Sequence, residues 1–212
     1  MIILGLTGSV AMGKSVAGRL FRRRGVPLFD SDAEVHALMA PGGAAVAAVG
    51  ARFPGALVDQ AIDRGRLGRI VYGDEKAMKE LEDILHPLVR AAQRDFLQEA
   101  AASGAKIVVL DIPLLFESGS EAGCDAIAVV SAPAFLQHRR ALRRPGMTAR
   151  RLARIVARQT ADSEKRRRAD FIIPSGFGKA VAAAHVGRIL KCLAAGTENI
   201  GPAKTRVTRK TP

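Results

Sequence analysis

Short apolar runs alternate along the chain with longer stretches in which apolar residues recur at helical spacing. The runs that predict strands cover residues 2–6, 26–29, 107–110, 126–130 and 171–173. They are short, aliphatic and followed by small or polar residues, as is typical of strands buried on both faces of a parallel sheet. The pattern therefore predicts an α/β fold, a doubly wound parallel sheet of about five strands.

Helical periodicity fills the intervals between these strands. We predict helices over residues 14–24, 75–102, 133–143, 148–159 and 178–194. Gly25 is the stop signal of the first helix, and Pro87 is expected to kink or interrupt the long second one. Residues 33 to about 103 contain no convincing strand, so this interval is predicted to be a helical insertion.

These elements predict one compact domain with insertions, which suits a chain of 212 residues. The core is expected in three segments, 1–32, 104–135 and 169–196. The helical insertion, 33–103, follows the second strand, and a basic helical pair over 136–168 precedes the fifth. The last segment, 197–212, is basic and poor in apolar residues, which predicts disorder.

Composition narrows the classes of protein that the pattern allows. The net charge of +13 favours anionic partners without choosing among nucleotides, nucleic acids and lipids. Cys124 and Cys192 are far apart and form no CxxC pair, which argues against a disulfide framework or a zinc site. No run approaches the roughly 20 apolar residues of a membrane span, and the N-terminus lacks a signal peptide's basic region. We expect a cytoplasmic protein with no membrane association.

A phosphate-binding loop lies between the first strand and the first helix. Residues 8–15 fit the pattern G-x-x-x-x-G-K-[ST], with Gly8 and Gly13 as its fixed glycines. The glycines let successive backbone N–H groups point at phosphate oxygens, and the helix adds its positive N-terminal end. Lys14 would reach the β and γ phosphates, and Ser15 would offer its hydroxyl to Mg²⁺. A chance match in a chain of this length is expected in about one case in a hundred.

Two acidic residues, Asp30 and Asp32, follow the second predicted strand. The carboxyl ends of parallel strands line one edge of a sheet, where ligands bind. Phosphoryl transfer needs a group that accepts or orients the proton of the attacking hydroxyl, and Asp is common in that role. From these residues alone, an equally ordinary interpretation is that Asp30 or Ser31 caps the next helix.

A series of motifs in this order resembles the dephospho-CoA kinases, and the resemblance spans about residues 2–190. Together these motifs are highly specific to that family. They comprise Gly5-Leu6-Thr7-Gly8, Gly13-Lys14-Ser15, Phe29-Asp30-Ser31-Asp32, Leu85-His86-Pro87, Asp111-Ile112-Pro113-Leu114-Leu115-Phe116-Glu117, Arg140, Arg144, Arg154-Ile155, Gln159 and Ala169-Asp170-Phe171-Ile172-Ile173.

The resemblance implies an enzyme that transfers the γ-phosphate of ATP to the 3′-hydroxyl of the dephospho-CoA ribose. It implies a nucleotide-binding core, a helical CoA-binding part and a lid. Asp32 falls on the family's catalytic base, while Lys14 and Arg140 would stabilise the transferred phosphoryl group. Contacts to ATP are expected from Gly8, Ala11, Met12, Gly13, Lys14, Ser15, Val16, Arg140 and Arg144. Contacts to the acceptor are expected from Asp30, Asp32, His86, Pro113, Leu114, Leu115, Glu117 and Arg154.

Several positions depart from the family pattern or allow two interpretations. The family loop usually reads GGIGSGKST, and here Ser9, Ala11, Met12 and Val16 replace four of its residues, which puts the stiffness of the loop and its affinity for ATP in question. Asp111 ends an apolar strand, where it could bind Mg²⁺ through water or cap the turn at Pro113. The family often has Asn after the fifth strand, whereas this chain has Pro174-Ser175-Gly176, so contacts to adenine stay open.

Charge runs elsewhere are expected to be solvated surface. They comprise the run Lys165-Arg166-Arg167-Arg168, the further lid arginines, and Lys204, Arg206, Arg209 and Lys210 in the tail. The further lid arginines could instead meet the CoA diphosphate. Two rival functions remain: another small-molecule P-loop kinase, and a nucleic-acid-binding ATPase suggested by the charge. The second is disfavoured because the chain has few aromatic residues for stacking on bases.

Overall fold

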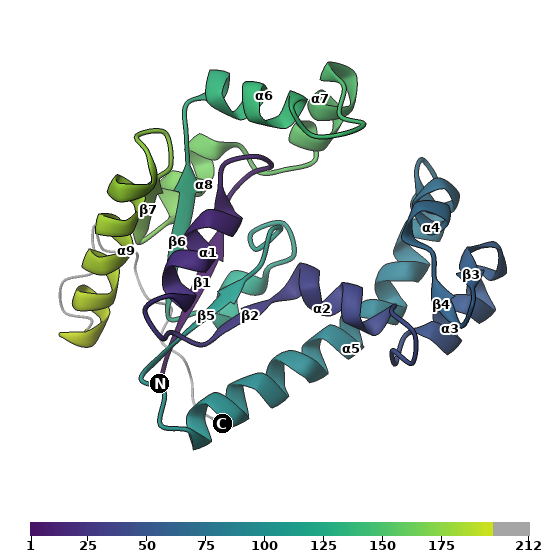
Figure 1. Ribbon diagram of the computed structural model, residues 1–212, viewed down its shortest axis with the longest axis horizontal. Coiled ribbons are helices and arrows are strands. Elements are labelled where there is room, and N and C mark those ends of the chain that lie inside the picture. The colour runs from purple at the N-terminus through teal and green to yellow at the C-terminus, as the bar shows by residue number, and fades with distance from the viewer. Residues whose placement is uncertain (197–212) are drawn as a thin grey trace. The chain divides into compact units, whose positions relative to one another are not determined.

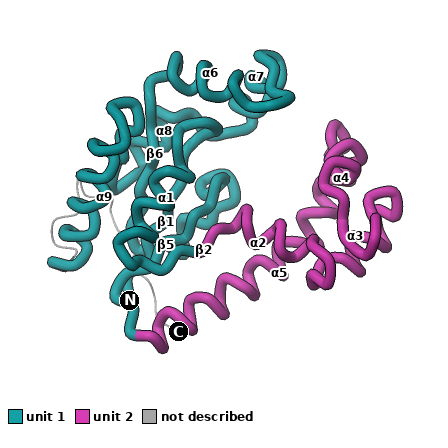
Figure 2. The backbone as a smooth tube through the Cα atoms, in the orientation of Figure 1, with its two compact units in different colours: residues 1–28, 104–212 teal, residues 29–103 magenta. Residues whose placement is uncertain are grey.

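The computed structural model describes residues 1–196 and divides the chain into two compact units (Figure 2). Unit 1 comprises residues 1–28 and the chain from Gly104 onward, and unit 2 comprises Phe29–Ser103. The predicted basic tail, 197–212, with Lys204, Arg206, Arg209 and Lys210, lies outside the described residues.

A five-stranded sheet in the order β2-β5-β1-β6-β7 confirms the predicted α/β fold (Figure 1). Its strands are β1 (Ile2–Thr7), β2 (Leu28–Asp30), β5 (Ile107–Asp111), β6 (Ala126–Ser131) and β7 (Phe171–Pro174). The central strand, β1, pairs in parallel with β5 and with β6, and β6 pairs in parallel with β7. The second strand begins two residues later than the apolar run predicts, because Pro27 lacks the N–H that a paired strand uses.

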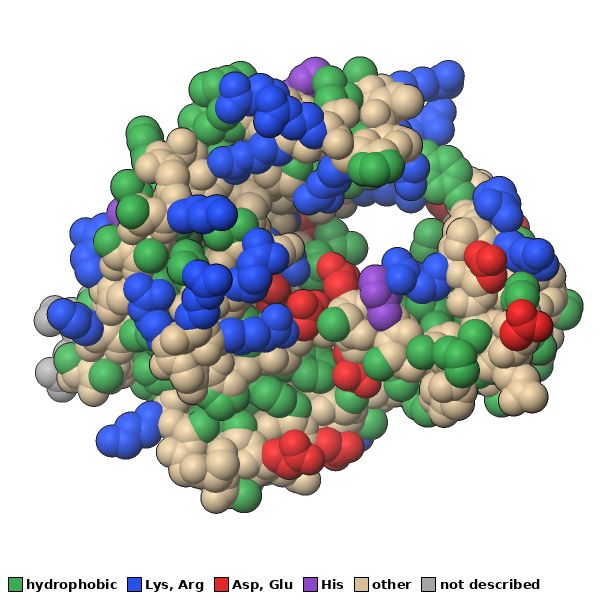
Figure 3. All heavy atoms as spheres, viewed as in Figure 1, with side chains coloured by type: hydrophobic (Ala, Val, Ile, Leu, Met, Phe, Trp, Pro, Cys, Tyr) green, Lys and Arg blue, Asp and Glu red, His purple; other side chains and the backbone are tan. Residues whose placement is uncertain are grey.

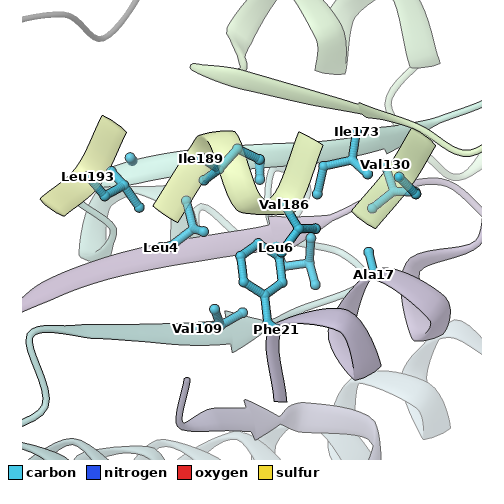
Figure 4. Close-up of a cluster of buried hydrophobic side chains, with 13 residues drawn as sticks. Leu4, Leu6, Ala17, Phe21, Val109, Val130, Ile173, Val186, Ile189 and Leu193 are labelled. Atoms are coloured by element: carbon cyan, nitrogen blue, oxygen red, sulfur yellow. The ribbon is translucent and has the colours of Figure 1, made fainter. Parts of the chain in front are cut away.

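Helices α1 (Lys14–Arg22) and α9 (Lys179–Ala194) cover one face of this sheet in unit 1. Leu4 and Leu6 of β1 alternate toward that face, where they meet Phe21 of α1 and Val186 of α9 (Figure 4). All four side chains are fully buried, so this cluster is the main core of unit 1. The opposite face of β6 packs instead against residues that follow β5, among them Leu115.

Three further helices of unit 1 precede β7. They are α6 (Ala134–Leu142), α7 (Ala149–Ala157) and α8 (Asp162–Arg168), and a short 3-10 turn, η2 (Ser120–Gly123), precedes β6. The first two confirm the predicted basic helical pair. The third was not predicted, because its sequence is almost entirely charged and shows no apolar stripe.

Unit 2 is mostly helical, as predicted, and has its own buried apolar cluster. Its elements are α2 (Ser31–Leu38), α3 (Val46–Arg52), η1 (Pro54–Ala56), β3 (Leu57–Val58), β4 (Ala61–Ile62), α4 (Arg64–Val71) and α5 (Glu75–Ala102). The expectation of no strand is wrong for β3 and β4, which form an antiparallel hairpin. With two residues each, they are too short to show a period-two pattern.

The expected interruption at Pro87 is also wrong, because α5 runs unbroken over 28 residues. A proline removes one backbone donor from a helix, and the turns on either side keep theirs. Leu81 and Leu85 are buried in the apolar cluster of unit 2 and hold the turns before Pro87. No helix among residues 1–196 combines the length and the apolar character that crossing a membrane would need.

Candidate active site

The loop between β1 and α1 forms a nest of backbone N–H groups. Gly13 has a φ of 97°, and Ala11 has a φ of 59°. Within the part of the chain that the structure describes, the N–H groups of Ala11, Gly13, Lys14 and Ser15 have no protein acceptor. These donors converge where the positive end of α1 begins, which is the arrangement that binds phosphate.

Gly8 has a different role from Gly13 in this loop. A Cβ at Gly8 would lie 2.6 Å from the carbonyl oxygen of Val130 in β6, so only glycine allows the loop to leave the sheet here. Gly13 instead supplies a left-handed conformation at the N-cap of α1. The two fixed glycines of the motif are thus required for close approach and for backbone geometry respectively.

Ala11 adopts the left-handed conformation without being glycine, at a cost of about 1–2 kcal/mol. Its methyl group is buried and packs in a small cluster with Ala141 and Leu152, against which Met147 also packs. Burying one methyl group returns about 0.8 kcal/mol, which offsets much of that strain. The residue that departs from the family pattern therefore joins the loop to the segment of α6 and α7.

Lys14 and Asp111 lie together at the heart of the loop. The Lys14 ammonium donates to Oδ1 of Asp111 at 2.7 Å, and both side chains are largely buried. The other carboxylate oxygen faces α1, since a Cβ at Gly18 would lie 3.2 Å from it. Ser15 is exposed in the first turn of α1. Lys14 and Asp111, predicted to meet phosphate and Mg²⁺ respectively, are thus paired. In the turn that follows β5, the Thr7 hydroxyl donates to the carbonyl of Pro113 at 3.0 Å.

The peptide groups of Val10 are held by two glutamine side chains. The N–H of Val10 donates to Oε1 of Gln159 at 3.0 Å, and the carbonyl of Val10 accepts from Nε2 of Gln137 at 3.0 Å. Gln137 lies on α6, and Gln159 follows α7. Gln159 belongs to the motifs quoted from the sequence, whereas nothing in the sequence singles out Gln137.

Arg140 is fixed by Ser175, which follows β7. Its guanidinium donates to the Ser175 hydroxyl at 2.9 Å and to the Ser175 carbonyl at 2.8 Å. The same hydroxyl donates to the carbonyl of Met12 in the phosphate loop. Arg140 is thereby held beside the loop, as a residue expected to contact ATP should be. Sequence reasoning left Ser175 open, because its partners lie 35 and 163 positions away.

Glu117 takes part in a buried ion pair that corrects the expectation for Lys165. The Lys165 side chain is fully buried, not solvated, and its ammonium lies 2.9 Å from Oε1 of Glu117 without hydrogen-bond geometry. The same oxygen accepts from the backbone N–H of Thr160. Burial raises the pKa of Glu117, but the Lys165 ammonium and the Thr160 N–H outweigh it, so the pKa lies below its ordinary value. The rest of the charge run is exposed or half-buried.

Only some of the residues near Glu117 that were predicted to contact the acceptor are exposed. Leu114 is 47% exposed, whereas Leu115 is fully buried. Leu115 therefore supports the wall from behind. Cys124 lies beneath β1, and burial, assisted by Asp125 and Glu121, raises its pKa to about 12, which disfavours a reactive thiolate.

The predicted residues of unit 2 are less constrained. Asp30 is the N-cap of α2 and accepts from the backbone N–H of Ala33 at 3.1 Å, as the capping interpretation predicted. Asp32 is exposed in the first turn of the same helix. His86 is exposed on α5 beside Pro87. Within the described residues, neither Asp32 nor His86 makes a hydrogen bond or an ion pair with another side chain.

Arginines gather over α6 and α7, where Lys and Arg side chains dominate the surface (Figure 3). Arg144 follows α6 and Arg154 lies on α7, and both are exposed. The structure places them on the segment predicted to act as a lid.

The sequence model of the dephospho-CoA kinase family matches residues 2–177. The chain is 60% identical over 166 residues to the dephospho-CoA kinase of Paramagnetospirillum magneticum, covering 78% of each chain. It is 51% identical over 190 residues to that of Mesorhizobium japonicum, covering 90% of this chain and 95% of the relative.

Solved structures agree in fold. The Thermus thermophilus protein TT1252 superposes with a TM-score of 0.77 at 31% identity, over 90% of this chain and 96% of that one. Dephospho-CoA kinase from Campylobacter jejuni superposes with a TM-score of 0.62 at 22% identity, over 92% of this chain and 98% of that one. At that identity, the second likeness concerns the fold alone.

Proposed function

The chain belongs to the dephospho-CoA kinase family, and from that premise we propose how its residues divide the work of the reaction. The protein is an ATP-dependent kinase that transfers the γ-phosphate of ATP to the 3′-hydroxyl of the dephospho-CoA ribose, giving CoA and ADP, the last step of coenzyme A synthesis. The observation that carries the proposal is the phosphate loop with its paired Lys14 and Asp111, set within a family match from residue 2 to residue 177.

On the donor side, the nest from Ala11 to Val16 holds the phosphates of ATP. Lys14 neutralises charge on the β and γ phosphates, and the pair with Asp111 keeps its ammonium at the loop. Arg140 adds a second positive charge from the lid segment, with Ser175 fixing its guanidinium, and Arg144 assists it. Catalysis here is mostly positioning and charge, as in phosphoryl transfer generally.

On the acceptor side, Asp32 accepts the proton of the ribose hydroxyl as it attacks the phosphorus atom. Two observations support Asp32 over Asp30. The Asp30 carboxylate already caps α2, whereas Asp32 is exposed one residue into that helix. Asp30 then orients the start of α2, and with it Asp32.

The remaining predicted acceptor contacts fall into two groups. His86, Pro113, Leu114 and Arg154 present atoms that dephospho-CoA could touch, and we propose them as its contacts. Leu115 and Glu117 act from behind, because Leu115 is fully buried and the Glu117 carboxylate is engaged by Lys165 and Thr160.

The oxygen donors at the loop suit Mg²⁺. Ser15 offers a hydroxyl and Asp111 a carboxylate, and hard divalent cations of this kind take few protein ligands beside phosphates and water. No group of three or more His, Cys, Asp or Glu side chains able to hold a metal occurs among the described residues, which agrees with such a sparse site. When bound with ATP, Mg²⁺ would neutralise phosphate charge. Lys14 and Arg140 supply the protein's own share of that neutralisation.

We place the reaction in the cytoplasm, with a small molecule as the partner and with no role for membranes or nucleic acid. Both cysteines are free, as in a reducing compartment. The positive charge on α6 and α7 would then attract ATP and the CoA diphosphate.

The test is ADP release from Mg·ATP with dephospho-CoA as acceptor, beside adenosine, nucleoside monophosphates and RNA. We expect rapid turnover with dephospho-CoA alone. Turnover of a nucleoside or nucleotide at a comparable rate would favour another small-molecule kinase. ATP hydrolysis stimulated by RNA would favour a nucleic-acid-binding ATPase.

A further inference from the structure

Both hydrogen-bonding groups of the Val10 peptide backbone are held by side chains from the lid segment. Gln137 of α6 donates to its carbonyl, and Gln159, which follows α7, accepts from its N–H. These partners lie 127 and 149 positions along the chain, so folding must bring two separate segments to one residue. Val10 immediately precedes the first free N–H of the phosphate nest, that of Ala11.

Stability alone does not account for this arrangement. Holding one glutamine side chain costs up to about 2 kcal/mol of conformational entropy. One intramolecular hydrogen bond returns about 1 kcal/mol net, because both groups could bond to water instead. Two glutamines on the half-buried backbone of Val10 therefore return no more than about what their ordering costs. Their clear effect is on orientation, because they determine which way the Val10 carbonyl and N–H point.

The next residue shows why that orientation matters. Ala11 must hold a left-handed φ of 59°, which a residue with a Cβ resists. If the preceding peptide were free to rotate, Ala11 could relax and its N–H would leave the nest. Packing of Ala11 against Ala141 and Leu152 holds its side chain, and the Met12 N–H closes the turn by donating to the Ser9 carbonyl. Gln137 fixes the plane of the peptide that joins Val10 to Ala11, and Gln159 fixes the plane of the peptide before it.

We propose that Gln137 and Gln159 are positioning residues that hold the phosphate loop in the conformation that receives the ATP phosphates. They act through Val10 and touch neither the reacting atoms nor the acceptor. The lid segment thus contributes to ATP binding in two ways: through Arg140, and through the shape of the loop itself. This inference deepens the proposed function and rests on its assignment of ATP to the loop.

The first experiment measures ADP affinity by calorimetry together with steady-state KM values for ATP and for dephospho-CoA. Gln137→Met and Gln159→Met keep the side-chain length and remove the hydrogen bond. Each is expected to weaken ADP binding and raise the KM for ATP about fivefold, the worth of one net hydrogen bond. The KM for dephospho-CoA should stay within twofold. The matched control is Gln98→Met, at an exposed position of α5.

The double variant tests whether the two glutamines, which hold the peptides on either side of the Val10 Cα, act together on one turn. If either loss already frees that turn, the second loss adds little, and the double variant should be weakened about tenfold or less. Independent contributions would multiply to about twenty-five-fold, and that result would contradict a shared action.

A pair of glutamate variants tests the atoms involved. Gln137→Glu and Gln159→Glu each add one negative charge near the loop, so simple repulsion of ATP is matched between them. Gln159→Glu keeps an acceptor for the Val10 N–H, whereas Gln137→Glu sets a carboxylate against the Val10 carbonyl. We therefore expect Gln137→Glu to bind ADP several-fold more weakly than Gln159→Glu. Equal or reversed affinities would overturn the assignment.

Thermal unfolding separates positioning from a general structural role. Methionine variants that bind ADP as tightly as Gln98→Met would overturn the proposal. So would variants that lose stability and raise both KM values together. A parent protein that binds ADP but does not phosphorylate dephospho-CoA would refute the proposed acceptor and leave this test intact, because ADP affinity does not depend on transfer.

Discussion

The candidate residues of unit 1 and those of unit 2 are held in different ways. In unit 1, Lys14, Glu117 and Arg140 each have a partner that fixes the charged group. In unit 2, Asp32 and His86 are exposed, with no such partner among the described residues. The charged candidates of unit 1 are therefore ordered by the protein itself, while Asp32 and His86 in unit 2 are left open to a ligand. Substitution of one of these paired charges in unit 1 should disturb folding, whereas substitution of Asp32 or His86 should disturb function alone.

The largest effect is expected for Lys14→Met. It removes the positive charge that we propose acts on the transferred phosphoryl group, so kcat should fall by about 10³-fold or more. Asp111 also loses its 2.7 Å ammonium contact, and the free energy of unfolding should drop by about 1–3 kcal/mol. Rapid-quench kinetics and urea unfolding measure the two effects. A stable protein with unchanged turnover would contradict both roles.

Asp32→Asn should lower kcat by about 10²–10⁴-fold, the usual contribution of a general base. Because Asp32 is exposed, unfolding and ADP affinity should match those of the parent. Asp95→Asn, at an exposed position of α5, is the control. Near-normal turnover would show that Asp32 is not the base, and a large loss of stability would contradict the contrast between the units.

Lys165→Met tests how much the buried ion pair between Lys165 and Glu117 stabilises unit 1. Removing one partner of a buried ion pair leaves the other without its counter-charge, which costs about 3–5 kcal/mol. Arg166→Met, one residue further along and exposed, should change stability little. Equal unfolding free energies for these two variants in urea would mean that the pair with Glu117 is not holding α8.

The same pair predicts a pH dependence of smaller size. The pKa of Glu117 is lowered in the folded protein, so its ionisation stabilises the fold above its ordinary value of 4.5. That contribution is lost as pH falls through the lower, folded-state value. The unfolding free energy of the parent should therefore approach that of Glu117→Gln between pH 7 and pH 3. A difference that stays constant or widens toward low pH would contradict the direction of the shift.

The smallest effect compares two strained residues. Gln60, in the β3–β4 hairpin of unit 2, has a φ of 61° and is exposed, and Ala11 has a φ of 59° and is buried. Gln60→Gly should raise the free energy of unfolding by about 0.5–1 kcal/mol, because only strain is lost. Ala11→Gly should give no gain, since it also loses the packing of a methyl group. Thermal unfolding of both variants measures these changes. A gain in stability for Ala11→Gly would contradict the proposal that packing of its methyl group offsets the strain.

Local sequence patterns predicted most of the sheet and the phosphate loop. Each strand of the sheet is an apolar run, and residues 8–15 carry their geometry in fixed glycines, so neighbours in sequence suffice. The family resemblance singled out Asp32 over Asp30 as the base and added a role for Arg140. What neither could supply was the partner of each group.

The missing features depend on contacts between distant segments. Lys165 sits in a run of four basic residues, and only its distance from Glu117 makes it different from the other three. Gln137 and Ser175 are ordinary polar residues until the chain brings them to Val10 and Arg140. The hairpin at Leu57–Val58 was missed for another reason, because two residues are too few to show a period.

The strand order also determines how late in synthesis of the chain the sheet can begin to form. The central strand β1 is synthesised first. Its neighbour β5 pairs with it from Ile107, which lies opposite Ile2 and 105 residues later in the chain. At about 5–20 residues per second, a ribosome needs on the order of 5–20 seconds to cover that interval. Throughout it, the apolar β1 and the face of α1 that it will bury have no sheet to join. All of unit 2 is translated in the meantime, so the segment that carries Asp32 and His86 has been synthesised before the phosphate loop can join its sheet.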